Sequence, residues 1–370
     1  MTPTTPPPLH HPLDEQRPEP GQVLAVAPGV GWVRMRLPFA LDHINLWLLA
    51  DVAEDGTPGW AVVDTGIAND ETRAAWEQVF ATGLQGRPVL RVINTHMHPD
   101  HLGLADWLCE RWHRPQAECR LWISATDWYV ARNARVQPGG FGGERTAAFF
   151  ARHGVADPAV LESIRHKPND YAAMVPAVPG RYRRLQDDLR VRMGAHDWFC
   201  IAGYGHAPEH MSLHCPALGV LISGDMVLPR ISTNVSVIDL EPEADPLGQY
   251  LDSLDEITRR VGPDAGDRAT LVLPSHGLPF TGLQARVDAL HAHHAERLAE
   301  VQAACAREPH SAADLMPLLF RRPLDLHQTR FALGEAIAHA HRLWHQGLLT
   351  PLEGADGVLR WGPGPAAPGA

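Results

Sequence analysis

The chain has 370 residues, of which 45% are hydrophobic and 20% are charged, a composition typical of a globular enzyme with one large domain or a large domain and a small appendage. Its 32 basic residues fall short of its 43 acidic ones. The resulting net charge of −11 argues against a protein that mainly binds a phosphate backbone. No apolar run approaches the roughly 18 residues of a membrane-spanning helix.

The first 20 residues are rich in proline and have neither a basic start nor an apolar core. We therefore expect a disordered tail over residues 1–20 rather than a signal peptide. The five cysteines are odd in number and widely spaced, without a Cys-x-x-Cys pair, which disfavours a disulfide framework and a thiolate metal site. These features predict a soluble cytoplasmic protein with no membrane partner.

The main part of the chain begins with short β-rich runs. Turn-forming residues separate the first four, which cover residues 22–28, 32–37, 45–51 and 60–64. This spacing predicts a strand meander. An amphipathic helix is then predicted over residues 71–85, and an apolar strand, residues 88–95, ends at Thr95.

Residues 102–185 are predicted to form a mostly helical insertion, which a glycine-rich loop at 139–143 interrupts. Strands resume after the insertion, at residues 189–193, 197–205, 211–216, 219–225 and 270–276. A helix over residues 247–261 comes before the last of them. The strands are too many and too hairpin-like for a doubly wound parallel sheet, so we expect two packed sheets with helices outside.

The end of the chain has a different pattern. A helix from residue 283 to about 307, a helix start at Ser311, a helix over 326–346 and a hairpin over 348–361 form the outline of a winged helix. Between Arg297 and Arg342 six arginines are nearly balanced by five acidic residues, so no basic recognition face is expected. We therefore expect this part to serve packing or homodimer formation rather than nucleic-acid binding.

The segment Asn94–His101 concentrates metal-ligand side chains directly after a strand. It contains His96, His98, Asp100 and His101 within six positions. Imidazole and carboxylate groups hold zinc, iron or manganese, and short spacing on a turn lets side chains converge on two neighbouring points. A merely polar turn is disfavoured because each buried imidazole would need a partner of its own.

Three later residues complete the expected metal centre. His210, Asp225 and His276 each lie where a buried strand opens into a loop, the usual place for site residues on a β-rich scaffold. With Asp225 as the bridge, the expected sets are His96, His98 and His210 for one metal and Asp100, His101 and His276 for the other. Because all seven positions hold competent ligands, a degenerate binding module is disfavoured.

In this order, the motifs resemble those of the metallo-β-lactamase-fold hydrolases, over about Gly21–Leu283. Asp64, Thr65 and Gly66 are similar to the strand-end motif of that family, in which the Asp supports the metal loop. The C-terminal part resembles the winged-helix appendage of the glyoxalase II-like and thioesterase-like branch.

The resemblance implies an α/β fold, an αββα four-layer sandwich over residues 21–282. It also implies the helical insertion at about 102–185, a small winged-helix-like domain over 283–362 and a disordered tail over 363–370.

The resemblance also implies a binuclear hydrolase. Two divalent ions, zinc in the first place and iron or manganese as alternatives, would activate a bridging hydroxide that attacks a thioester, lactone or related ester of a small acyl compound. Asp100 would be both a ligand and the group that takes or relays a proton. Two alternatives stay open: an endoribonuclease or phosphodiesterase of the same fold, and a mononuclear iron sulfur dioxygenase.

One segment departs from the pattern of the family. The usual Gly-His-x-Pro-Gly-His is replaced by Gly205–His210, in which Glu209 stands at the second glycine. This turn must avoid a positive φ or accept strain. We keep His210 as the ligand by its position, and we expect His206 to support the site from behind and Glu209 to be a solvated turn residue.

Overall fold

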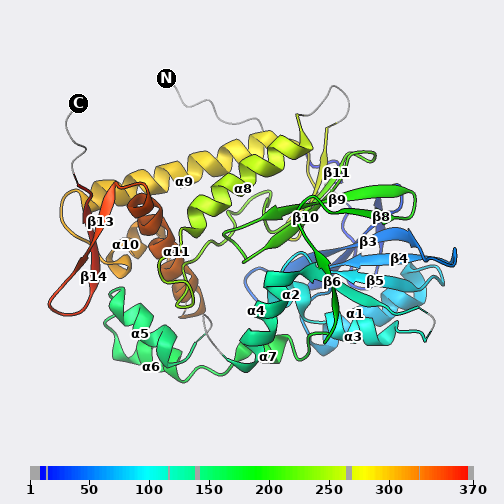
Figure 1. Cartoon of the computed structure of the whole chain (residues 1–370), viewed down its shortest axis with the longest axis horizontal. Helices are drawn as coiled ribbons and strands as arrows, with labels where there is room; N and C mark the ends of the chain where they lie inside the picture. Colours follow the sequence, from blue (N-terminus) through cyan, green and yellow to red (C-terminus); the bar gives the residue numbers. More distant parts are fainter. Residues whose placement is uncertain are drawn as a thin grey trace. The chain divides into compact units, whose positions relative to one another are not determined.

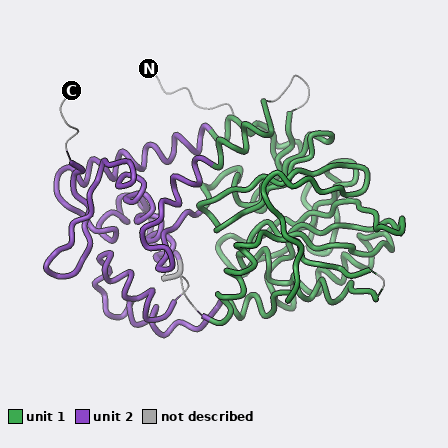
Figure 2. Tube along the Cα trace, in the orientation of Figure 1, with its two compact units in different colours: residues 1–136, 171–233, 253–287 green, residues 137–170, 234–252, 288–370 purple. Residues whose placement is uncertain are grey.

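The computed structural model (Figure 1) describes residues 9–13, 16–115, 117–137, 142–263, 269–324 and 326–365, with the backbone alone at 326 and 327. The chain divides into two compact units, which Figure 2 distinguishes by colour. Unit 1 contains residues 1–136, 171–233 and 253–287, and unit 2 contains residues 137–170, 234–252 and 288–370. All the residues expected at the metal centre belong to unit 1.

Unit 1 contains a seven-stranded sheet whose strands follow one another in chain order. These strands are β1 (Leu24–Ala27), β2 (Val30–Arg36), β3 (His43–Val52), β4 (Pro58–Val63), β5 (Val89–Ile93), β6 (Arg120–Ser124) and β7 (Tyr182–Leu185). β1 to β4 form an antiparallel meander, whereas β4 to β7 pair in parallel. The parallel half therefore presents several strand ends at the same edge of the sheet.

A second sheet of five strands packs against the first. Its strands are β8 (Arg190–Met193), β9 (His196–Gly203), β10 (His210–Cys215), β11 (Val220–Gly224) and β12 (Leu271–Pro274), in the order β12-β11-β10-β9-β8. Trp32 and Trp47 of the first sheet share one buried apolar cluster with Trp198 and Leu213 of the second. The predicted mixed α/β fold with packed sheets is confirmed.

Helices of unit 1 connect the parallel strands. They are α1 (Asp70–Gln78), α2 (Pro99–Leu102), α3 (Ala105–Arg111), α4 (Ala125–Val136) and α7 (Asp170–Met174), and α1 continues as the π-helix η1 (Val79–Gly83). The side chain of Asn69 caps α1 by accepting the N–H of Thr72. Trp76 of α1 donates its indole N–H to the carbonyl of Thr65 at 2.8 Å, so α1 is fixed to the end of β4.

The bounds predicted for the helical insertion, residues 102–185, are wrong. β6 and β7 both lie within residues 102–185, and both extend the main sheet in parallel. The two strands are only five and four residues long, and β7 includes Arg183 and Arg184, so neither gives an apolar run that stands out from the surrounding helical pattern. Unit 2 takes only residues 137–170 of this segment, with α5 (Glu144–Arg152) and α6 (Pro158–Arg165), and residues 139–141 of the expected glycine loop lie outside the described residues.

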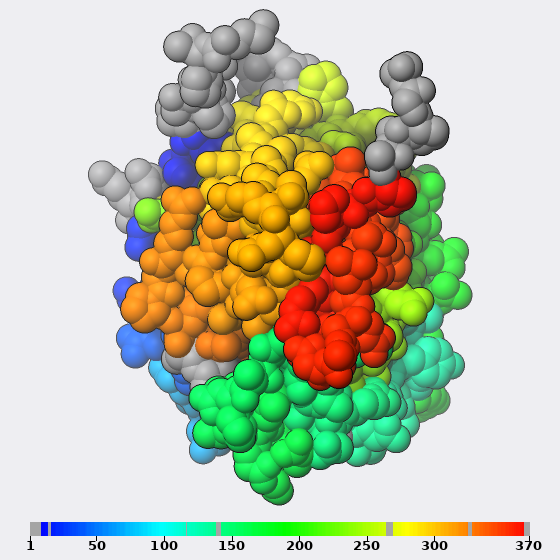
Figure 3. Space-filling view, turned by 90° about the vertical axis from the view of Figure 1, so that its left-hand side faces the viewer, coloured from blue at the N-terminus to red at the C-terminus, as the bar shows by residue number. Residues whose placement is uncertain are grey.

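The rest of unit 2 follows the predicted order of helix, helix, helix and hairpin. Its elements are α9 (Leu283–Cys305), α10 (Ala312–Leu319), α11 (Leu326–His345), β13 (Leu349–Glu353) and β14 (Leu359–Pro363), while α8 (Pro246–Val261) and α9 both cross the division between the units. Figure 3 shows α9 and α10 in yellow and orange beside the red hairpin. Val301, Leu315, Leu343 and Trp361 form their shared core.

The two expected tails are partly ordered. Residues 1–8, 14–15 and 366–370 lie outside the described residues. In the remainder, His10 pairs with Thr281 in an isolated β-bridge, and Leu13 packs against the core of unit 1. Pro363, where the C-terminal tail was expected to begin, pairs with Leu349 inside the hairpin. These stretches therefore differ from the free tails that their composition predicts.

All five cysteines lie in described parts of the chain, and all are free and buried. Among the described residues, no helix combines the length and the apolar character needed to cross a membrane.

Candidate metal centre

The segment from the end of β5 through α2 contains four of the expected residues. Because β5 lies between two parallel neighbours, its end opens at the edge of the sheet. His98 is extended, with φ −61° and ψ 149°, and Pro99 begins α2. His98 therefore stands on extended backbone, and Asp100 and His101 stand on the helical turn that follows it. The amide of Asn94 closes the loop by donating to the carbonyl of His101 at 2.6 Å.

Asp64 supports this loop from the end of β4. Its carboxylate accepts the N–H of Thr95 at 2.8 Å and the O–H of Thr95 at 2.9 Å, and it lies 2.9 Å from Nδ1 of His101. A bond from Nδ1–H to this carboxylate directs the other ring nitrogen, Nε2, into the centre. Asp64 has a φ of 60°, a conformation that Asp tolerates better than most residues.

Three imidazoles meet at one point of the site. Nε2 of His96 lies 2.8 Å from Nδ1 of His98, which lies 3.1 Å from Nε2 of His206, and the remaining distance, between Nε2 of His206 and Nε2 of His96, is 3.3 Å. The ligands of a tetrahedral zinc, each about 2.0–2.1 Å from the metal, lie roughly 3.3 Å from one another. These three nitrogens therefore have the spacing of one ligand set.

One carboxylate and two imidazoles form a neighbouring group. Oδ2 of Asp100 lies 3.7 Å from Nε2 of His101 and 3.4 Å from Nε2 of His276. Nδ1–H of His276 donates to the carbonyl of His43 at 2.8 Å, so its Nε2 faces the carboxylates. Asp100, His101 and His276 have ligand atoms within 4.8 Å of one another.

Asp225 lies between the two groups. Its Oδ2 is 3.3 Å from Nε2 of His206 and 3.5 Å from Nε2 of His101, while its Oδ1 is 3.4 Å from Nε2 of His276. The Asp225 carboxylate therefore lies within 3.5 Å of imidazole nitrogens of both groups.

His210 and His206 exchange the roles expected for them. His210 is the first residue of β10, and its Nε2 accepts the backbone N–H of Asp225 at 3.2 Å. A Cβ at Gly224 would lie 2.2 Å from this nitrogen, so the ring is packed behind the loop that carries Asp225. His206, four residues earlier, points its Nε2 at His96 and His98. The expectation that His210 completes the first set is therefore corrected in favour of His206.

Glu209 also differs from the expectation. It is 9% exposed rather than solvated, and its carboxylate contacts α4. The positive φ of this turn falls at Gly205, at 95°, whereas the described non-glycine residues with positive φ are Asp64, Gln85 and Asp188. Replacement of the glycine usual at position 209 therefore costs no left-handed backbone strain.

The electrostatics of the centre suit cation ligands. Burial, together with His206, lowers the pKa of His98 to about 3, so this imidazole is neutral with a free lone pair. Burial acts to raise the pKa of Asp225, but His276 and His101 hold it well below its ordinary value. Burial also acts to raise the pKa of Asp100, but the same two histidines lower this pKa to about 2.

Buried polar atoms of the centre remain without hydrogen bonds. Within the part of the chain that the structure describes, Nε2 of His101 and Oδ1 of Asp225 have no hydrogen-bond partner. An unsatisfied buried donor or acceptor is costly, and an unpaired buried carboxylate more so. The convergence of imidazole nitrogens and carboxylate oxygens on neighbouring points fits a bound divalent cation.

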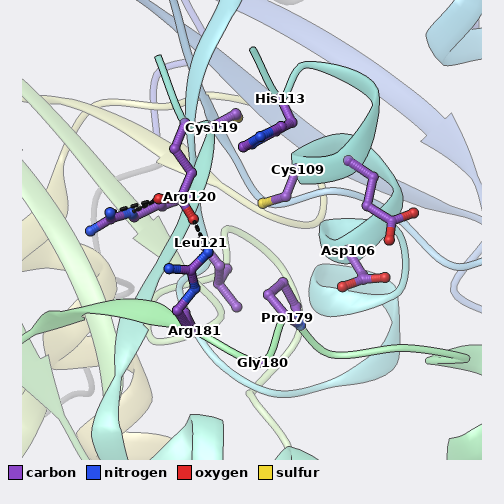
Figure 4. Close-up of a pocket in the computed structure, with 11 residues that line it drawn as sticks. Asp106, Cys109, His113, Cys119, Arg120, Leu121, Pro179, Gly180 and Arg181 are labelled. Atoms are coloured by element: carbon purple, nitrogen blue, oxygen red, sulfur yellow. Dashed lines mark hydrogen bonds and ion pairs between the residues drawn. The ribbon is translucent and has the colours of Figure 1, made fainter. Parts of the chain in front are cut away.

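A separate cavity in unit 1 contains none of the expected site residues. It has a volume of about 190 Å³ and is lined by Asp106, Cys109, His113 and Cys119 among others (Figure 4). A hydrogen bond with Cys119 and burial raise the pKa of Cys109 well above its ordinary value. Thiols of this kind are structural rather than reactive.

Comparison with known proteins agrees with this geometry. A family model described as the metallo-beta-lactamase superfamily matches residues 42–276, which are more than half of the chain and include every expected ligand. The chain belongs to the metallo-beta-lactamase superfamily. A second model, the metallo-beta-lactamase-like C-terminal domain, matches residues 298–364.

Members of this superfamily resemble the chain over most of its length. The crystal structure of a beta-lactamase domain protein from Burkholderia ambifaria is 51% identical, with a TM-score of 0.88, and the match covers 96% of this chain and 98% of that one. The metallo-beta-lactamase family protein TTHA1429 from Thermus thermophilus is 26% identical, with a TM-score of 0.71, over 92% and 100% of the two chains. The probable metallo-hydrolase YqjP of Bacillus subtilis (strain 168) is 24% identical over 78% of this chain and 84% of that protein.

Proposed function

We propose that this chain is a metal-dependent hydrolase with two divalent ions, zinc in the first place, that cleaves a thioester, lactone or related ester of a small acyl compound. His96, His98 and His206 would hold one ion, and Asp100, His101 and His276 would hold the other, with Asp225 shared. The observation that supports this proposal best is the convergence of both groups on the Asp225 carboxylate, 3.3 Å from His206 and 3.4 Å from His276.

When bound, such ions supply Lewis acidity, which polarises a carbonyl oxygen and makes water nucleophilic near neutral pH. Groups of the chain itself then divide the remaining tasks. The carboxylate of Asp64 and the backbone carbonyl of His43 fix the rings of His101 and His276 by accepting from Nδ1 of each ring. Asp100 is 19% exposed, and the contacts found for its carboxylate among the described residues all use Oδ2. Its Oδ1 is therefore the atom that we assign to taking up or relaying a proton.

The ester and thioester preference rests on the resemblance to glyoxalase II-like enzymes and on charge. A net charge of −11 suits a small substrate better than a polyanion. The expected result is two divalent metals per chain by elemental analysis of protein purified without added metal, with turnover of at least one member of a thioester and lactone panel. One iron per chain, with oxygen uptake on a persulfide and no hydrolysis, would overturn the proposal, as would RNA cleavage as the sole activity.

The ligand assignment has its own matched test. His206→Ala should lose one metal per chain, because it deletes one of three nitrogens from the first set. His210→Ala should keep both metals, with an affinity lower by about 10- to 100-fold, the effect typical of removing a supporting contact. His214, buried on the same strand as His210 and outside both groups, provides the control as His214→Ala. Loss of a metal in His210→Ala and not in His206→Ala would refute the assignment.

We also propose that α9 to β14 form a winged-helix-like domain that serves packing or self-association. This proposal is supported by the order of its elements and by its nearly balanced charge between Arg297 and Arg342. Sedimentation equilibrium should then show a dimer, and a monomer at every concentration would contradict self-association.

A further inference from the structure

Two buried carboxylates connect helix α4 to two loops of unit 1, the one that carries His96 and His98 and the one that carries His206. These are called the two histidine loops below. Asp127, in the first turn of α4, has no exposed surface. Its Oδ1 accepts the N–H of Met97 at 2.8 Å, between His96 and His98. Its Oδ2 accepts the N–H of Glu209 at 2.7 Å, three residues after His206. A single carboxylate therefore bonds to the backbone of both loops.

Glu209 makes a second connection in the opposite direction. Its Oε2 accepts the O–H of Thr126 at 2.7 Å and the N–H of Thr126 at 3.3 Å. Thr126 lies in the first turn of the 12-residue helix α4, where free N–H groups and the helix dipole favour a negative charge. Ser124 fixes Asp127 in turn, since its hydroxyl donates to Oδ2 and accepts the N–H of Asp127, both at 3.1 Å.

We propose that Asp127 and Glu209 form a reciprocal clasp that positions the two histidine loops, so that His96, His98 and His206 converge. The inference rests on the proposed metal-binding function, which it deepens by naming positioning residues outside the ligand set. Asp127 receives two N–H donors and one O–H donor. Only a carboxylate can accept all three, because an amide has a single acceptor oxygen and would turn its NH₂ group towards a donor.

The clasp accounts for the departure from the glycine usual at position 209. A glycine there would leave the hydroxyl and N–H of Thr126 without this acceptor. Glu209 supplies the carboxylate and needs no positive φ. The loop also has a support that does not depend on the clasp, because the O–H of Tyr171 donates to the carbonyl of Met97 at 2.6 Å. Variants of the clasp are therefore expected to fold.

The first test compares zinc affinity by competition with a chromophoric chelator. Asp127→Asn should bind zinc about 10- to 100-fold more weakly than the parent chain, the range found when partners of metal ligands are removed. Glu209→Gly should be weakened in the same direction, and Glu209→Gln, which keeps an acceptor oxygen, should recover most of the affinity.

Asp51 supplies a matched control in the same unit. It is buried, accepts the N–H groups of Val52 and Gly194, and pairs with Arg91 at 2.7 Å. Asp51→Asn thus removes a buried carboxylate that also joins two segments, without touching a histidine loop. It should lower the melting temperature and leave zinc affinity unchanged. Parent-like zinc affinity in both Asp127→Asn and Glu209→Gly, or an equal loss in Asp51→Asn, would overturn the clasp.

A second readout needs no metal. In metal-free protein, hydrogen exchange in peptides that contain Met97 and Glu209 should be at least about tenfold faster in Asp127→Asn than in the parent, because two backbone N–H groups lose their acceptor. If Asp127→Asn does not fold, Thr126→Val tests the Glu209 contact through the same peptides. A parent chain that binds no metal would defeat the proposed function, whereas unchanged exchange in the folded variants would defeat the clasp alone.

Discussion

His153 of unit 2 is a buried neutral imidazole, and its protonation at acidic pH should destabilise the fold. Its Nδ1–H donates to the carbonyl of Phe149 at 2.8 Å, and its ring contacts the ring of Phe149 with centroids 4.3 Å apart. Within the described residues its Nε2 is buried and has no hydrogen-bond partner. Burial lowers the pKa of His153 to about 4. A proton added at Nε2 would therefore place an uncompensated charge in an apolar setting.

The size and sign of the effect follow from the two pKa values. The fall from 6.5 to about 4 is about 2.5 units, which at 1.36 kcal/mol per unit is about 3 kcal/mol. The unfolded chain binds the proton more tightly than the folded chain does, so acid favours unfolding. The stability contributed by the neutral ring is complete above pH 6.5 and is lost as the pH falls towards 4.

The measurement compares the parent chain with His153→Gln between pH 7 and pH 4. Hydrogen exchange in peptides of α5 reports the opening free energy of this part of unit 2, without assuming that the whole chain unfolds in one step. His153→Gln does not titrate, so the advantage of the parent should shrink by about 3 kcal/mol over this range. His166→Gln, at a histidine whose side chain is 70% exposed, is the control. A difference between parent and His153→Gln that stays constant within about 1 kcal/mol would refute the reasoning.

Three further outcomes are expected. Burial raises the pKa of Glu335 to about 7, so between pH 4.5 and pH 7 the folded chain keeps a proton that the unfolded chain releases. The free energy of unfolding therefore falls as the pH rises through this range. Glu335→Gln should remove at most about 3 kcal/mol of this pH dependence, measured by hydrogen exchange in peptides of α11. Ser311→Ala removes a capping box with Asp314 and should cost about 1 kcal/mol in thermal unfolding, with recovery in Ser311→Thr. Chelation of divalent metal should lower the melting temperature measured by calorimetry, because metal at about 100 times its Kd stabilises the fold by about 2.7 kcal/mol. The chelator should lower the melting temperature of an Asp225→Asn variant by less.

Sequence is most informative where the site is contiguous. His96, His98, Asp100 and His101 follow one strand within six positions, so a strand end and a turn suffice to bring them together. The support of this loop by Asp64 was implied by the resemblance, and the structure shows its atoms: bonds to Thr95 and a contact with His101. Local chemistry of this kind needs no knowledge of the overall packing.

Long-range pairing was less predictable. β6 and β7 are short strands among helices, and only their parallel partners distinguish them from turns. The roles of Asp127 and Glu209 depend on the contact between residues 82 positions apart, which no local pattern indicates. An Asp three residues after Ser124 looks in sequence like part of an ordinary helix start. The bonds that its carboxylate accepts from Met97 and Glu209 become visible only when the two loops are in place.

The exchange of His206 and His210 shows what decides a ligand when two candidates share one turn. Both are histidines of the same hexapeptide, so residue type and the motif alone cannot separate them. Strand pairing separates them. β10 begins at His210, which pairs with Gly203 of β9, and this pairing holds the ring of His210 where its Nε2 accepts the N–H of Asp225. His206 precedes the strand, and its ring points towards His96 and His98. The start of the strand therefore decides which ring faces His96 and His98, because the ring of the strand's first residue is already engaged with the backbone.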